Sequence, residues 1–180
     1  MALVAKLNTI EALFRKAERE RFRALNQSVP LHLADHFYNF CVTAHSFRDY
    51  LKVRLALPNG TDRILQHRWD SAPLLVAVKD IANSAKHFQL YKTPRTRRVR
   101  HARTSGVKII FTDDGEIEGI RVPQVPTIYV VLENGERRDL ESFLDAVLKY
   151  WQSELSAHGI RMRRQSHRNL RGKMSNDSIG

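Results

Sequence analysis

The chain has little cysteine, with Cys41 as the one thiol among 180 residues. A single thiol can form neither an internal disulfide nor a cysteine-based zinc site, so both kinds of stabilised domain are excluded. Long apolar runs are lacking too, because the longest, such as 72–78, fall far short of the roughly 20 residues that span a bilayer. We therefore expect a cytoplasmic protein that does not enter a membrane.

The common sequence signatures of catalysis are missing as well. The chain has no Gly-x-x-x-x-Gly-Lys phosphate loop, no Gly-x-Gly-x-x-Gly loop, no His-Glu-x-x-His motif and no Gly-x-Ser-x-Gly nucleophile elbow. We expect no cofactor and no metal ion. What is present is ordinary globular composition, with 42% apolar and 27% charged residues.

Two segments lack acidic residues altogether. The chain has 30 Lys and Arg against 19 Asp and Glu, a formal net charge of +11. Segments 92–108 and 161–173 hold 13 of the basic residues and no acid, which leaves 17 basic and 19 acidic residues elsewhere. The surplus charge is therefore local, in two basic runs beside a nearly neutral body.

Basic runs of this kind gain affinity for polyanions by displacing counterions from phosphates. They predict binding of nucleic acid or a ribonucleoprotein; an acidic protein partner, or a solvated linker and tail, are the alternatives. The predicted nucleic-acid-binding residues are Arg95, Arg97, Arg98, Arg100, Arg103, Arg161, Arg163, Arg164, Arg168 and Arg171.

Apolar residues recur at spacings of three and four through the first 91 residues, which predicts a helical bundle. We expect helices over 9–26, from Pro30 to residue 55, over 61–69 and from Pro73 onward, where Leu74, Ala77, Val78, Ile81, Ala85 and Phe88 form the buried stripe.

After residue 105 the period changes to two, which is typical of strands. Segments 107–111 and 116–122 predict one hairpin, and 127–132 followed by Asn134-Gly135 begins a second. Pro123 and Pro126 should keep their stretch out of a central ladder. A last helix should begin after Asp139 and end at Gly159.

The predicted fold is therefore α+β: an N-terminal helical bundle, a small antiparallel β-meander and a C-terminal helix. We divide the chain into a bundle (1–91), a basic connector (92–105), hairpins with a closing helix packed on the bundle (106–159) and a flexible basic tail (160–180).

Two helices each carry a histidine beside a carboxylate. At about 100° per residue, Asp49 lies about 40° from His45, and Asp80 shares a face with His87. If the two faces meet, one imidazole can act as general base and the other as general acid in RNA cleavage without a metal. The alternative is a solvated or helix–helix polar face, because His45 and His87 lie roughly 100° and 130° from the centres of their apolar stripes.

The segment from Ala44 to Tyr50, followed by Asp80-Ile-Ala-Asn-x-x-Lys-His87, resembles a group of uncharacterised bacterial helical proteins. That resemblance covers most of residues 36–151 and supports the architecture, but it implies no activity. The helical half is also similar to HEPN-type ribonucleases, which implies a metal-independent ribonuclease as an alternative function. Their Arg-x4–6-His motif occurs at Arg95 and at Arg161, inside the basic runs and no more often than chance predicts.

Overall fold

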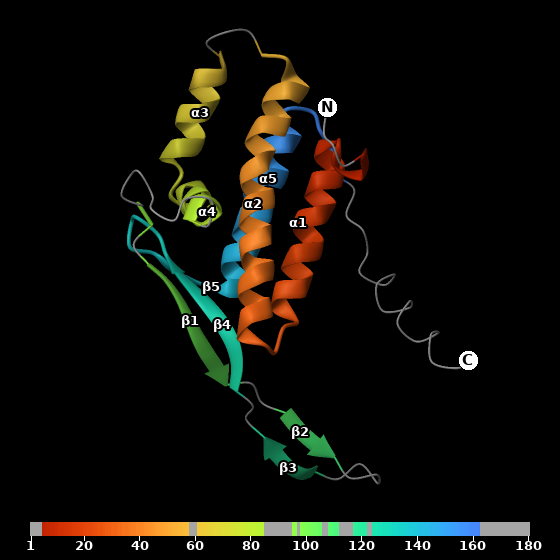
Figure 1. Ribbon diagram of the computed structural model, residues 1–180, viewed down its shortest axis with the longest axis vertical. Coiled ribbons are helices and arrows are strands. Elements are labelled where there is room, and N and C mark those ends of the chain that lie inside the picture. Colours follow the sequence, from red (N-terminus) through yellow and green to blue (C-terminus); the bar gives the residue numbers. More distant parts are fainter. Residues whose placement is uncertain are drawn as a thin grey trace, which may run out of the picture.

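The computed structural model describes residues 5–57, 61–84, 95–96, 98–105, 108–111, 117–121 and 124–162. Its described part has the predicted α+β architecture, with helices first, then strands, then a closing helix (Figure 1). None of the helices in these ranges is long and apolar enough to cross a bilayer. A short 3-10 helix, η1 (Ala5–Leu7), precedes them.

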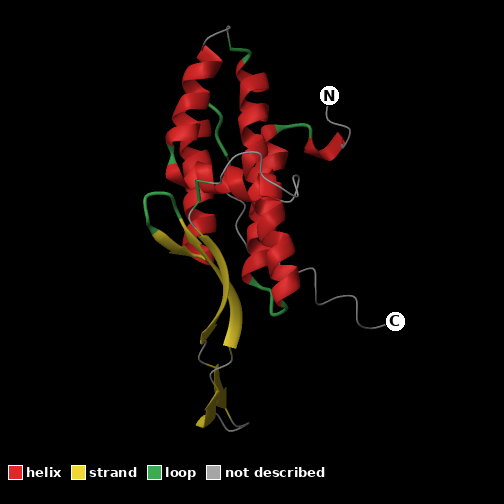
Figure 2. Cartoon of the chain, turned by 60° about the vertical axis from the view of Figure 1, so that its left-hand side comes forward, coloured by secondary structure: helices red, strands yellow, loops and turns green. Residues whose placement is uncertain are grey.

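The first two helices form an antiparallel pair (Figure 1), and the strands project from one end of the helical part of the molecule (Figure 2). Helix α1 (Ile10–Leu25) begins at Thr9, whose side chain accepts a hydrogen bond from the Ala12 N–H at 3.1 Å. Helix α2 (Pro30–Leu55) has its proline in the first turn, where the missing N–H costs nothing. Both helices confirm the predicted ranges within one or two residues.

The next two helices fold back over α2. Helix α3 (Thr61–Ser71) leads directly into α4 (Pro73–Ser84), which contacts α2, α3 and α5. The buried face of α4 is broader than the predicted stripe, because neighbours lie on more than one side. It includes Leu75, Val76 and Ala82, whereas Leu74 is half-buried. Ala85 and Phe88 of that stripe lie outside the described residues.

The strands form one three-stranded antiparallel sheet and a separate hairpin. The sheet has the order β1 (Arg98–Ser105), β4 (Gln124–Val131), β5 (Arg137–Asp139). The predicted hairpin of β2 (Lys108–Phe111) and β3 (Ile117–Arg121) is present and extends beyond β1 and β4, away from the helices (Figure 1).

Two features of the sheet differ from the sequence-based expectation. Strand β1 lies inside the predicted connector. Its sequence, rich in arginine, lacks the alternation of apolar and polar residues that predicts a strand. The prediction that Pro126 stays out of a central ladder is wrong, because β4 is the middle strand and Pro126 is in register with Arg103. The Leu132 N–H donates to the Glu136 carbonyl on the β5 side of β4, and alternation puts the Pro126 nitrogen on that same side. Among the described residues β5 pairs only with 129–131, so the proline removes no ladder hydrogen bond there. Pro123 lies outside the described residues.

Helix α5 (Leu140–Ala157) closes the core. Asp139 caps it by accepting from the Ser142 N–H at 2.8 Å. At its other end Gly159, with φ +74°, lets the Ile160 N–H reach the Leu155 carbonyl at 2.9 Å, which confirms the predicted stop. Of the predicted Asn134-Gly135 turn, only Gly135 has a positive φ, +90°.

Aromatic rings join α5 to the bundle. The Trp151 ring lies 5.3 Å from Phe47 of α2 and 5.7 Å from Trp69 of α3, and all three side chains are fully buried. Ring pairs at such separations add stability beyond their buried area. Phe14 extends this cluster to α1, since its ring lies 5.8 Å from Phe47.

Candidate nucleic-acid interface

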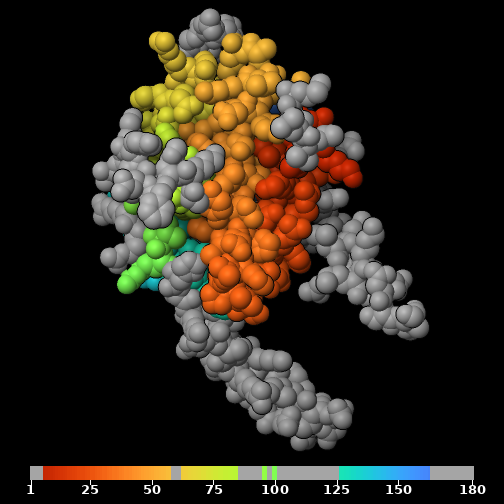
Figure 3. Space-filling view, in the orientation of Figure 1, coloured from red at the N-terminus to blue at the C-terminus, as the bar shows by residue number. Residues whose placement is uncertain are grey.

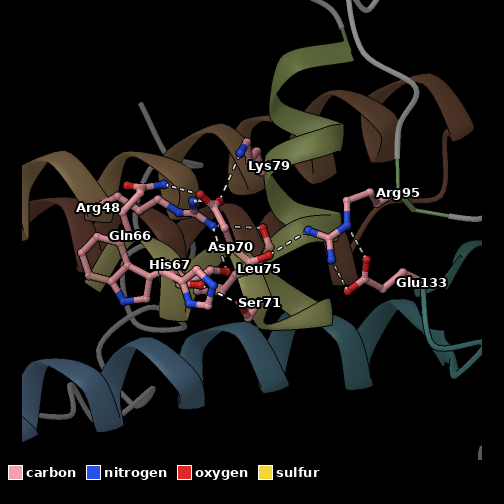
Figure 4. A network of polar contacts seen from close by, with 10 residues as sticks. Arg48, Gln66, His67, Asp70, Ser71, Leu75, Lys79, Arg95 and Glu133 are labelled. Atoms are coloured by element: carbon pink, nitrogen blue, oxygen red, sulfur yellow. Dashed lines mark hydrogen bonds and ion pairs between the residues drawn. The ribbon is translucent and has the colours of Figure 1, made fainter. Parts of the chain in front are cut away.

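A buried arginine organises the polar centre of the molecule (Figure 4). Arg48 of α2 is 3% exposed, and its Nη1 donates to Asp70 Oδ1 at 2.7 Å. Its Nη2 lies 3.4 Å from the carbonyl oxygens of Trp69 and Leu75. The guanidinium thus ties α2 to the junction between α3 and α4.

The carboxylate of Asp70 receives two further donors. Gln66 Nε2 donates to Oδ2 at 2.8 Å, and Lys79 Nζ donates to Oδ1 at 3.1 Å. Partial burial acts to raise the pKa of Asp70, but the hydrogen bonds from Gln66, Arg48 and Lys79, with the charge of Arg48, outweigh it and hold the pKa well below its usual range. Asp70 therefore stays charged at neutral pH.

This centre also anchors the start of β1. Arg95 donates to the Asp70 carbonyl at 2.9 Å and binds Glu133 with two nitrogens, at 2.7 and 2.9 Å (Figure 4). The next residue, Thr96, donates through both its N–H and its hydroxyl to Asp80 Oδ2, each at 2.8 Å. The sequence predicts a nucleic-acid contact for Arg95 and a catalytic role for Asp80. In the structure Arg95 binds Glu133, and Asp80 binds Thr96.

The register of β1 on β4 places one connector arginine beside an aromatic ring. Arg100 is directly opposite Tyr129, while Val99 and His101 are opposite Val130 and Ile128. Val130 and Ile128 are fully buried in the core, so the alternation of a strand puts Tyr129 on the other side of the sheet. Arg100 is exposed, and the described residues between 95 and 100, bright green in Figure 3, lie at the surface of the molecule.

A second arginine, on β5, covers the tyrosine. Arg137 Cζ lies 4.0 Å from the centre of the Tyr129 ring, a cation–π contact. Arg137 is exposed and has no ion pair with any described residue, in contrast to Arg138, which binds Glu136 at 2.6 Å. We call Arg100, Tyr129 and Arg137 the sheet face. It presents two cations, one of them a planar guanidinium that lies on a ring, and these can contact phosphates and bases.

The other predicted arginines divide into two groups. Arg98 and Arg103 belong to β1, in register with Val131 and Pro126, and Arg161 is exposed after the end of α5. The rest of the predicted set, Arg97, Arg163, Arg164, Arg168 and Arg171, lies outside the described residues.

Of the predicted catalytic residues, two lie on α2, and Asp80 lies on α4, where its carboxylate accepts from Thr96. His45 is half-buried on α2. Asp49 is exposed and lines an open hollow of about 640 Å³ with Tyr50, between α2 and the start of α1. His87 lies outside the described residues, so its pairing with His45, and the ribonuclease alternative, stay predictions.

The chain matches no family model, no curated protein and no solved structure. The resemblances noted from the sequence therefore stay predictions, and function has to be argued from the residues themselves.

Sequence reasoning missed Tyr129 and Arg137 as site residues. One signal was present, since alternation in the segment 127–132 already sets Tyr129 apart from its apolar neighbours. No sequence pattern indicated that Arg137 would lie over that ring, because the contact depends on how β5 pairs with β4.

Proposed function

We propose that the protein binds nucleic acid through the sheet face together with the basic runs 92–108 and 161–173. The observation that carries this proposal is the contact of Arg137 with Tyr129, directly opposite Arg100, on the side of the sheet that faces away from the core. Strand β1 holds Arg100 of the first basic run beside an aromatic ring, and a cation next to a ring suits a polyanion with planar bases better than an acidic protein.

Charge is the main source of the proposed affinity. Each lysine or arginine that contacts a phosphate releases condensed counterions, so affinity falls steeply as salt is raised. Arg100 and Arg137 have no ion pair within the described ranges, so phosphate contact costs them no existing carboxylate partner. Arg95 differs, because its guanidinium already binds Glu133.

The test measures binding of a labelled oligonucleotide by fluorescence anisotropy between 50 and 300 mM salt, with the double variant R100Q/R137Q. The magnitude of the slope of log affinity against log salt should fall by about 1.4–1.8, at about 0.7–0.9 for each of the two lost phosphate contacts. The matched control is R54Q/R63Q, which removes two exposed arginines near the end of α2 and the start of α3, remote from the sheet (Figure 1).

The control should keep nearly the wild-type slope, although both variants lose two positive charges. Equal slopes for the two variants would show that net charge alone governs binding. Absence of binding to RNA and DNA at 50 mM salt would refute the proposal, and recovery of a stoichiometric acidic protein after nuclease treatment of a lysate would favour the docking alternative.

A further inference from the structure

We infer that the sheet face takes single-stranded rather than duplex nucleic acid, with one base stacked on Arg137. This inference rests on the proposed function and adds the class of nucleic acid and the direction in which its backbone lies.

Two planar groups meet on the sheet face. The Tyr129 ring and the Arg137 guanidinium lie in contact, with 4.0 Å between Cζ and the ring centre. A guanidinium is flat and has two faces, and the tyrosine occupies one of them. Arg137 is exposed to solvent, and arginine planes stack on bases as aromatic rings do, so we assign the base to the guanidinium face that points away from the tyrosine.

Stacking on a protein side chain requires an unpaired base. In a duplex both faces of each interior base are covered by neighbouring base pairs, so a stacking surface cannot reach them. Unpaired bases can turn out of the strand and stack on a protein side chain. A ring under an exposed guanidinium offers such a stacking surface and therefore favours a single strand.

The neighbours of Tyr129 on the two adjacent strands carry opposite charges. Tyr129 has Arg100 as its neighbour on β1 and Asp139 as its neighbour on β5. Adjacent strands are about 4.8 Å apart, so a phosphate beside the stacked base lies within reach of the Arg100 guanidinium. A phosphate on the other side would meet the Asp139 carboxylate. The backbone of the bound strand therefore lies on the β1 side of the sheet.

The test compares a 12-nucleotide oligo(U), an oligo(dT) of the same length and a 12-base-pair duplex at 100 mM salt. Y129L removes the ring and keeps a side chain of similar bulk, whereas Y129F keeps the ring. We expect Y129L to bind either single strand about tenfold more weakly, the lower part of the range for one base stack, with an unchanged salt slope. Y129F should bind within twofold of wild type.

R137K separates stacking from charge, because lysine keeps the charge and loses the flat guanidinium. It should weaken single-strand binding while leaving the salt slope nearly unchanged. The matched control is R138K, one residue along β5, where Arg138 binds Glu136 and contacts no ring of a described residue; it should bind as wild type. Urea unfolding of every variant verifies that the fold is retained.

Two results would overturn the inference. One is duplex affinity equal to or greater than single-strand affinity in the wild type. The other is a folded Y129L protein that binds oligo(U) and oligo(dT) as wild type does. In both cases nucleic acid still binds, so the proposed function survives; loss of all binding in the wild type would instead refute the proposed function itself.

Discussion

Replacement of Asp70 by asparagine tests whether the buried arginine depends on its carboxylate. The amide would keep the shape of the side chain and a carbonyl oxygen, but the charge of Arg48 would lose its anion. Arg48 is 3% exposed, so water cannot replace the lost partner. Removing one partner of a fully buried ion pair costs about 3–5 kcal/mol.

The expected loss here is smaller, for two reasons. The Asp70 side chain is 33% exposed, so the pair is partly solvated, and Arg48 keeps its contacts with the Trp69 and Leu75 carbonyls. We expect D70N to lose about 2–3 kcal/mol of unfolding free energy, or about 5–10 °C in Tm for a chain of this size. Urea denaturation followed by circular dichroism at pH 7 measures it.

The pH dependence of the same variant gives a second measurement. The Asp70 pKa is lower in the folded protein than the ordinary value of about 3.9, so its stabilising contribution is complete above that value and is lost as pH falls below it. Asparagine does not titrate, so the difference between wild type and D70N should shrink between pH 5 and pH 3.

The control is D62N, which removes the carboxylate of the half-exposed pair between Lys52 and Asp62. It should stay within about 0.5 kcal/mol of wild type. Equal urea midpoints for D70N and D62N at pH 7, or a difference between wild type and D70N that stays constant down to pH 3, would refute the reasoning.

Two further predictions concern the helices. T9A removes the side-chain acceptor for the Ala12 N–H at the start of α1 and should cost about 1 kcal/mol in urea unfolding, whereas T9S should cost little; an unchanged T9A would show that this cap is not needed. Cys41 is fully buried, which raises the pKa of its thiol, so a disulfide reagent at pH 8 should label it only after unfolding in urea; rapid labelling of the native protein would contradict its position in the core.

Most local elements of this protein could be predicted from the order of its residues alone. Spacings of three and four indicated α1 and α2, because a helix buries one face of its own residues whatever lies opposite. Pro30, Asp139 and Gly159 marked helix ends through the backbone geometry that each of them favours. The two hairpins followed from alternation and turn residues in the same way.

Features that depend on partners distant in the chain emerged only when the elements packed together. Strand β1 exists because Arg98–Ser105 pairs with β4, 19 to 33 residues later in the chain, and no alternation of apolar residues in the sequence indicates this strand. Arg48 can be buried because Asp70 of α3 supplies a carboxylate that pairs with its charge. The sheet face follows the same rule, since Arg100 and Arg137 come together around Tyr129 through strand pairing, which a count of basic residues cannot reveal.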